Sequence, residues 1–214
     1  MSYQDYSSCS DADQDKFAAI AKKWLDDDPL ILDTETTGLY NDAEIVEISI
    51  VDKNGWPALD TLIKPQSPIP ANATEIHHIT NDMVKDAPGW ADVYDEFCKL
   101  TKDRRLVVYN LDYDRRLLQQ TIQLQSSKGA LSPWHHPEKM LSCAMLLFAP
   151  YYGEWDEYRE SWKWQKLVNA ARYMEVKIDG QAHRALTDCL MTLGVLRGMA
   201  NSLPESAERQ NAGV

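Results

Sequence analysis

The residues best suited to chemistry are two acids at the end of an apolar run. Asp33 and Glu35 lie two positions apart and follow Leu30-Ile31-Leu32, a predicted buried strand. Side chains two apart on a strand leave the same face, so the carboxylates repel one another, by about 3 kcal/mol at about 5 Å and an effective dielectric near 20. A bound Mg²⁺ or Mn²⁺ removes that penalty. The alternative is a pair of solvated acids at a strand end, and these two residues alone do not decide between the two.

Asp188 and His183 add to this pattern near the C-terminus. Asp188 falls at the start of a helix predicted over 184–201, on a half-apolar face where an unpartnered acid is costly to bury. An acid in the first turn of a helix is also common without any such role, because it favours the helix dipole. His183 is expected on the loop after Gly180, within reach of an ion that Asp188 holds. A lone histidine is more often structural or solvated.

A third group of acids joins a predicted strand to a predicted helix in the run Asn110-Leu111-Asp112-Tyr113-Asp114. Asp112 suits the N-cap position and Asp114 falls in the first turn. As isolated features, both are typical of a helix start.

Taken in order, these segments resemble the DnaQ-like (DEDDh) 3′→5′ exonucleases, the family of exodeoxyribonuclease X and of the proofreading subunit of bacterial replicative DNA polymerase. The run Asp33-Thr34-Glu35-Thr36-Thr37-Gly38-Leu39 matches the family pattern D-x-E-T-T-G-L. Ile76-His77-His78-Ile79-Thr80 is similar to I-H-x-I-T, and Tyr109 to Asp114 is similar to H-N-x-x-F-D. His183 to Asp188 matches H-x-A-x-x-D. Three motifs in the correct order are strong evidence together, although each is weak alone.

The resemblance implies a two-metal-ion hydrolysis that releases nucleoside 5′-monophosphates, with two Mg²⁺ (or Mn²⁺) ions as cofactors. Asp33 would bridge both ions, and Glu35 and Asp188 would complete the first. The register of the motif gives the remaining metal role to Asp114, directly or through water, and leaves the capping role to Asp112. His183 would act as the general base.

The resemblance also implies the substrate, the 3′ end of a nucleic acid. The residues expected to contact it are Thr36, Thr37, Leu39, His77, Tyr109 and Asn110. Tyr109 departs from the family, because many members have histidine at this position. The run around His183 and Cys189 is closest to exodeoxyribonuclease X, which favours DNA, in single-stranded form, over RNA. An alternative function is a proofreading or adaptor subunit that acts mainly through a partner such as a polymerase.

The elements that must position these residues indicate one α/β domain of the RNase H-like type. We expect a mixed five-stranded sheet that begins with a three-strand meander (30–32, 44–52 and 56–64) and is flanked by helices. The predicted organisation is an N-terminal extension with a helix (1–28), an exonuclease domain (29–203) and a polar C-terminal tail (204–214).

Two further groups of residues allow both a structural and a nucleic-acid-binding interpretation. The spacing of Trp155, Tyr158 and Trp162 predicts an amphipathic helix packed on the core, and the alternative is exposed rings that stack on bases. Five arginines either contact phosphates or pair with surface acids: Arg104, Arg105, Arg115, Arg116 and Arg184.

Composition limits the possible functions. A formal net charge of −11 argues against a protein that coats nucleic acid, but not against an enzyme that holds only a strand end. No apolar run approaches the ~20 residues that span a bilayer, and the polar N-terminus does not resemble a secretory signal. The 4 cysteines form no C-x-x-C pair. We therefore expect a cytoplasmic protein with free thiols.

Overall fold

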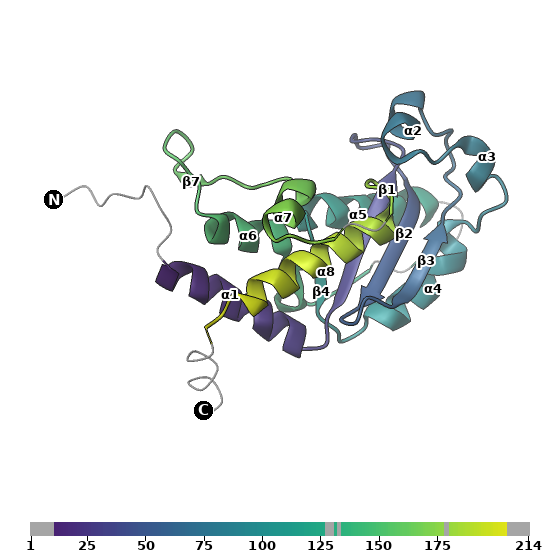
Figure 1. The fold of residues 1–214 in the computed structure, drawn as a ribbon. Helices are drawn as coiled ribbons and strands as arrows, with labels where there is room; N and C mark the ends of the chain where they lie inside the picture. Colours follow the sequence, from purple (N-terminus) through teal and green to yellow (C-terminus); the bar gives the residue numbers. More distant parts are fainter. Residues whose placement is uncertain (1–10, 127–130, 132–133, 178–179, 205–214) are drawn as a thin grey trace.

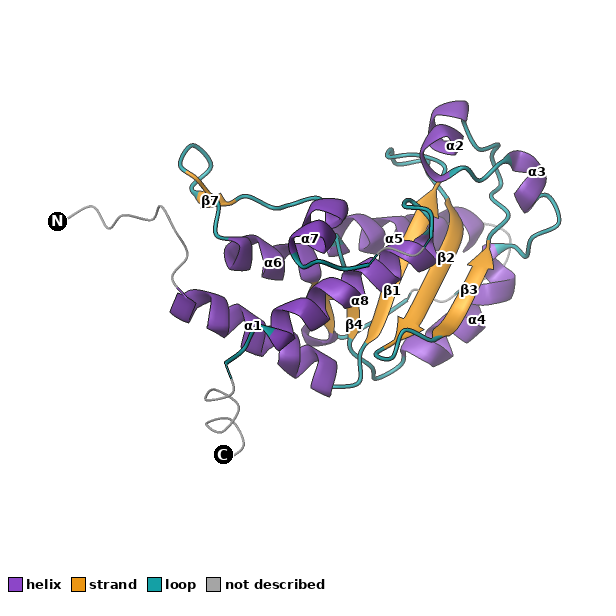
Figure 2. Cartoon of the chain, in the orientation of Figure 1, coloured by secondary structure: helices purple, strands orange, loops and turns teal. Residues whose placement is uncertain are grey.

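The fold is built on a five-stranded mixed sheet in the order β3-β2-β1-β4-β5. The structure, a computed structural model, describes residues 11–126, 131, 134–177 and 180–204. The strands are β1 (Leu30–Thr36), β2 (Ile45–Asp52), β3 (Pro57–Leu62), β4 (Leu106–Val108) and β5 (Leu141–Cys143). β1, β2 and β3 form the predicted antiparallel meander, and β4 and β5 run parallel to β1. The predicted mixed sheet is confirmed (Figure 2).

Helices cover both faces of this sheet (Figure 1). They are α1 (Asp11–Asp26), α2 (Ala71–His77), α3 (Asn81–Val84), α4 (Trp90–Thr101), α5 (Leu111–Ser126), α6 (Ala144–Tyr152), α7 (Leu167–Tyr173) and α8 (Ala185–Asn201), with a 3₁₀ turn at Glu138–Met140. Ile31 faces the core beneath α1, α6, α7 and α8, whereas Leu30 and Leu32 face the core beneath α4 and α5. This alternation places Asp33 and Glu35 on the α8 side of β1.

α1 is packed into the body of the chain. Ala18 and Ala21 are fully buried, α1 contacts α6 and α8, and Figure 1 shows α8 crossing α1. Residues 1–10 and 205–214 of the expected extension and tail lie outside the described residues. Within the part of the chain that the structure describes, no helix combines the length and the apolar character needed to cross a membrane.

The predicted helix around Trp155 and Trp162 is wrong. These residues lie on a two-stranded hairpin, β6 (Trp155–Asp156) and β7 (Ser161–Trp162), and α7 begins only at Leu167. The two rings pair across the hairpin with centroids 5.1 Å apart, and the Asp156 carboxylate accepts the Tyr158 backbone N–H at the tip. The spacing that suggested a helical face therefore reflects cross-strand pairing of aromatic residues.

The capping role predicted for Asp112 is also wrong. α5 begins at Leu111, so the residue before the helix is Asn110, whose carbonyl accepts the N–H groups of Tyr113 and Asp114. Asp112 is an exposed residue of the first turn. The helix begins two residues earlier than predicted, soon after the short strand β4 ends at Val108.

Candidate active site

Three carboxylates meet where β1 ends and α8 begins. Oxygen atoms of Asp33, Glu35 and Asp188 all lie within 4.8 Å of one another. The strand alternation directs Asp33 and Glu35 towards α8, and Asp188 lies in the first turn of that helix. The structure thus brings together three of the four predicted acids from segments more than 150 residues apart in the chain.

The fourth acid, Asp114, approaches from α5. It is 4% exposed, and one of its oxygens accepts the Thr34 hydroxyl at 2.8 Å. Its negative charge raises the pKa of Asp33, although burial contributes more to that rise. Asp114 therefore belongs to the same electrostatic cluster as the three carboxylates at β1 and α8.

Burial and mutual repulsion raise the pKa of every acid in the cluster. Burial is the largest cause for Asp33, whose pKa lies well above its ordinary value, followed by the charges of Asp114 and Asp188. Burial, then Asp188, raises the pKa of Glu35 to about 8. Burial raises the pKa of Asp114 to about 7 and that of Asp188 to about 6. The four carboxylates cannot all ionise near neutral pH unless positive charge enters the site.

A divalent cation fits this set of donors. Asp33, Glu35 and Asp188 offer hard carboxylate oxygens close enough to share one ion, the ligand type that Mg²⁺ and Mn²⁺ prefer. Such an ion would also offset the burial and the repulsion that raise the pKa values of these acids. These residues are the ones that would hold the metal, with Asp114 beside them.

His183 lies next to Asp188, on the loop before α8. Its backbone N–H donates to a carboxylate oxygen of Asp188 at 3.2 Å, and its side chain is exposed. Its φ of 63° is in the left-handed region, which is uncommon for a residue other than glycine. The contact with Asp188 is made by the backbone, so the imidazole itself stays available.

Glu47 on β2 is a site residue that sequence analysis missed. It pairs with Glu35 across the β1–β2 ladder, is 4% exposed, and accepts hydrogen bonds from Arg184 and the Ala185 N–H. An acid within the apolar run of β2 was the available signal, because a buried acid needs partners.

All five arginines considered as phosphate contacts have protein partners. The ion pairs are Arg104 with Asp28, Arg105 with Asp27, Arg115 with Glu138, and Arg184 with Glu47, and Arg116 donates to the Leu39 carbonyl. Four of the five arginines therefore pair with acids, whereas Arg116 bonds a backbone carbonyl.

The residues after Glu35 form a braced turn. The hydroxyl of Thr36 bonds to the Tyr113 hydroxyl and donates to the Gly38 carbonyl, and the Thr37 hydroxyl accepts the Glu44 N–H. Leu39 at the end of the turn is 70% exposed. The turn is therefore held by hydrogen bonds to the body of the protein, while Leu39 is exposed to solvent.

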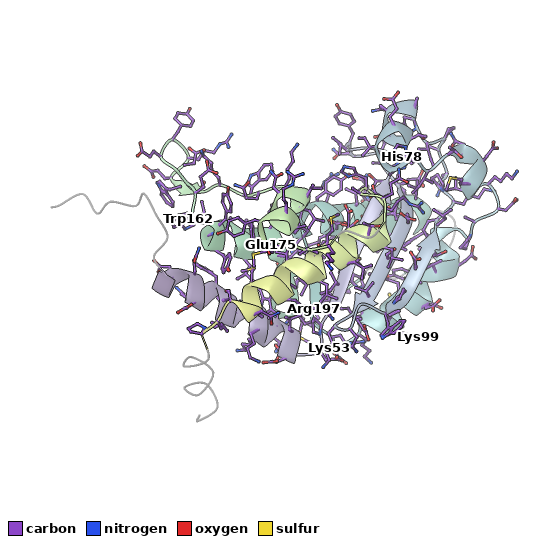
Figure 3. The ribbon with its side chains drawn as sticks, viewed as in Figure 1. Lys53, His78, Lys99, Trp162, Glu175 and Arg197 are labelled. Atoms are coloured by element: carbon purple, nitrogen blue, oxygen red, sulfur yellow. The ribbon has the colours of Figure 1, made fainter. Side chains whose placement is uncertain are left out.

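His77 supports the same turn from α2. The buried ring accepts the Ile79 N–H at Nδ1, which leaves Nε2 to donate to the Thr36 carbonyl at 3.2 Å. Burial lowers the pKa of His77, so the ring is neutral near pH 7. Figure 3 shows its neighbour His78 beside α2, at the same end of the molecule.

Tyr109 and Asn110 differ in exposure. Tyr109 is buried and its hydroxyl donates to the Gln165 carbonyl at 2.8 Å, whereas Asn110 is exposed at the edge of the sheet. Of the two, Asn110 is the one whose side chain is open to a ligand.

Comparison with known proteins gives the family. Residues 30–196 match the exonuclease family designated RNase_T. Exonuclease CP81 of Escherichia phage 186 is 48% identical over 180 residues, which cover 84% of this chain and 92% of that protein. Exodeoxyribonuclease 10 of Escherichia coli K12 is 29% identical over 186 residues, 84% of this chain and 71% of that protein.

Solved structures show the same fold. Exonuclease X in complex with 5′ overhanging duplex DNA aligns with a TM-score of 0.58 at 26% identity, over 81% of this chain and 92% of that one. The nuclease domain of 3′hExo, a DEDDh family member bound to rAMP, aligns with a TM-score of 0.59 at 16% identity, over 83% and 94%. The predicted RNase H-like fold is thereby confirmed, and the chain belongs to the DnaQ-like exonuclease family and is a metal-dependent nuclease.

Proposed function

We propose that this chain removes nucleoside 5′-monophosphates one at a time from the 3′ end of an unpaired DNA strand. The observation that carries the proposal is the convergence of Asp33, Glu35 and Asp188 within 4.8 Å, with Asp114 and His183 beside them. Mg²⁺ or Mn²⁺ ions held by these acids would neutralise the phosphate and lower the pKa of water. Two such ions are proposed, and Asp33 would help to hold both.

His183 is proposed to take the proton from the attacking water. The water oxygen then bonds to the terminal phosphorus, the bond from phosphorus to the 3′-oxygen of the preceding nucleotide breaks, and a nucleoside 5′-monophosphate leaves. The exposed imidazole beside Asp188 supports this role, because a general base must reach the water that it deprotonates.

Specificity for ends is proposed to come from the turn after Glu35. Thr36 and Thr37 would meet the terminal 3′-OH, Leu39 would flank the terminal nucleotide, and Asn110 would lie at the neighbouring edge. The buried His77 and Tyr109 would shape the substrate pocket from behind these residues. The bracing of Thr36 by Tyr113 and His77, together with the exposure of Leu39, supports a preformed pocket for a strand end.

A labelled-strand assay tests the function. A 5′-labelled DNA strand with a free 3′-OH should give a ladder shortened from the 3′ end in Mg²⁺ or Mn²⁺, and none in EDTA. Matched RNA and duplex substrates should be degraded more slowly. Cleavage of a circular single strand, or of a strand with a blocked 3′ end, at the rate of the free strand would show an endonuclease instead.

We further propose that the chain acts without a polymerase partner. The apolar side of α1 packs on α6 and α8, so those residues are not available to dock another protein. Activity of the purified chain alone supports this proposal, and activity that requires an added polymerase favours the adaptor alternative. The described cysteines, Cys98, Cys143 and Cys189, are free thiols, which supports action in a reducing cytoplasm.

The acid cluster predicts that the metal-free protein loses stability as pH rises. In the unfolded chain these acids titrate near pH 4, whereas in the folded protein burial and repulsion raise the pKa values of Asp188, Asp114 and Glu35 to about 6, 7 and 8. The folded state therefore binds more protons, and its stability falls between about pH 5 and about pH 9. Melting temperatures in EDTA should fall across this range, and Mg²⁺ or Mn²⁺ should restore them most at the alkaline end. A rise in melting temperature on adding metal that is equal at the acidic and the alkaline end of the pH range would contradict this explanation.

Trp164 is predicted to contact the unpaired strand upstream of its 3′ end. It is 56% exposed and precedes Gln165, which is tied to Tyr109 at the end of β4, the parallel neighbour of β1. In Figure 1 the hairpin and the end of β1 lie on the same side of the molecule, with α7 between them. Stacking on a base is worth about 1–3 kcal/mol, so Trp164→Ala should raise KM for a long strand by about 5- to 150-fold.

A dinucleotide provides the control, because it lacks the upstream nucleotides that are proposed to stack on Trp164. Its KM should be unchanged in Trp164→Ala. An equal rise in KM for the long strand and the dinucleotide would mean that Trp164 supports the folding of the site. An unchanged KM for both substrates would show that Trp164 does not stack on the strand.

A further inference from the structure

Glu47 is a buried acid that the proposed chemistry does not use. It lies opposite Glu35 in the antiparallel ladder, so both carboxylates leave the same face of the sheet. The run around it in β2 is apolar and buried, and Glu47 itself is 4% exposed. A buried anion persists only where donors replace water.

Two groups at the start of α8 supply those donors. Nε of Arg184 lies 3.1 Å from each carboxylate oxygen of Glu47, and Nη2 adds a further bond to Oε1. The backbone N–H of Ala185, the first residue of α8, donates to Oε2 at 2.9 Å. A planar guanidinium that bonds a carboxylate through two nitrogens fixes orientation as well as distance.

These contacts anchor the loop that carries two site residues. The residue preceding α8, Arg184, makes no side-chain capping bond to its own helix, so Glu47 provides the cap from β2. The carbonyl of Arg184 accepts the Asp188 N–H, and the neighbouring His183 has the left-handed φ of 63°. Such a backbone persists where surrounding contacts determine it.

We propose that Glu47 and Arg184 are a positioning pair, which fastens the start of α8 to β2 so that His183 and Asp188 face Asp33 and Glu35. Glu47 is then neither a metal ligand nor a base, and the guanidinium of Arg184 is held by Glu47 rather than by a substrate phosphate. The proposal rests on the proposed roles of His183 and Asp188 in 3′-end hydrolysis.

The test compares Glu47→Gln, Arg184→Gln and the double variant with the unchanged chain. Each single variant should lower kcat by about 10- to 100-fold, the usual loss when a group behind a metal ligand is removed. KM for the strand should change by no more than about twofold, since no binding contact is removed. Because the two residues act as a unit, the double variant should lose about as much as either single variant. Asp28→Asn, which breaks the Arg104 ion pair outside the site, is the matched control and should keep full activity.

A second readout does not depend on activity. Backbone hydrogen exchange at residues 183–188 should accelerate in Glu47→Gln and in the double variant, but not in Asp28→Asn. A single variant leaves one charge of the pair without its partner and can fail to fold for that reason. The double variant removes both charges, so the test can still be made with it.

Three outcomes would overturn the proposal. A higher KM with an unchanged kcat in Arg184→Gln would identify a phosphate contact. If the Mn²⁺ concentration needed for half-maximal rate rises as much in Glu47→Gln as in Glu35→Gln, Glu47 is a metal ligand. Unchanged exchange at 183–188 would refute the positioning role directly. Lack of activity in the unchanged chain would instead refute the proposed function and leave the exchange result to decide the role of the pair.

Discussion

Asp33→Asn should lower turnover by about 10³-fold or more and, in the absence of metal, raise the melting temperature. Asp33 would help to hold both proposed ions, because one of its oxygens lies within 4.8 Å of oxygens of Glu35 and Asp188 and the charge of Asp114 also acts on it. Charge stabilisation by bound cations is worth several kcal/mol, and each 1.4 kcal/mol is about a factor of ten in rate. Asparagine keeps the size and one oxygen but loses the charge, so the change isolates electrostatics from packing.

The gain in stability follows from the direction of the pKa shift. Burial, then Asp114 and Asp188, raise the pKa of Asp33 well above its value in an unfolded chain. Above that unfolded value the unfolded state gives up the Asp33 proton while the folded state retains it, so folding becomes less favourable as pH rises. Asparagine does not titrate, and the advantage of the variant in melting temperature should therefore grow as pH rises above the unfolded value of about 4.

Thermal denaturation in EDTA and single-turnover hydrolysis in Mn²⁺ measure the two effects. Asp26→Asn is the control, because this exposed acid pairs with Lys22 on α1 and is not one of the clustered acids. Asp26→Asn should change neither the melting temperature nor the rate of hydrolysis. An Asp33→Asn protein that keeps the wild-type rate, or that melts lower than the wild type at alkaline pH, would contradict the electrostatic account.

The sequence was sufficient for most of the sheet because its signals are local. The alternation in β1 predicted that Asp33 and Glu35 share a face, and the predicted meander of 30–32, 44–52 and 56–64 corresponds to β1, β2 and β3. The hairpin at Trp155 and Trp162 was mistaken for a helix because residues seven apart meet both on a helical face and across a short hairpin. Only the backbone pairing seen in the structure distinguishes a hairpin from a helix here.

The site was less accessible to sequence reasoning where it depends on register. Glu47 reaches the site because β2 pairs with β1 in a register that sets it opposite Glu35, and Arg184 reaches Glu47 from 137 positions away. Neither the pairing of Glu47 with Glu35 nor the contact of Arg184 with Glu47 can be recognised from the neighbouring sequence. Asp114 was separated from Asp112 by resemblance alone, whereas the structure separates them physically: Asp114 is buried against Thr34, and Asp112 is exposed.

His183→Gly should lower turnover by about 10²–10⁴-fold, the usual contribution of a positioned general base, and leave metal binding nearly intact. The hydrogen bond to Asp188 is donated by the backbone N–H of His183, which glycine retains. Glycine also suits the φ of 63° better than alanine does, so the loop should keep its shape.

Added imidazole makes this prediction specific. The side chain removed from His183→Gly leaves room beside Asp188, and free imidazole should restore part of the rate there but none in Asp33→Asn, which lacks a carboxylate rather than a base. Mn²⁺ titration of the rate should give a half-saturation close to wild type in His183→Gly. A half-saturation raised as much as the rate is lowered would make His183 a metal ligand, and the deprotonation of water would then need another group. Because the backbone contact with Asp188 survives the substitution, a loss of rate without a loss of metal affinity can be assigned to the imidazole alone.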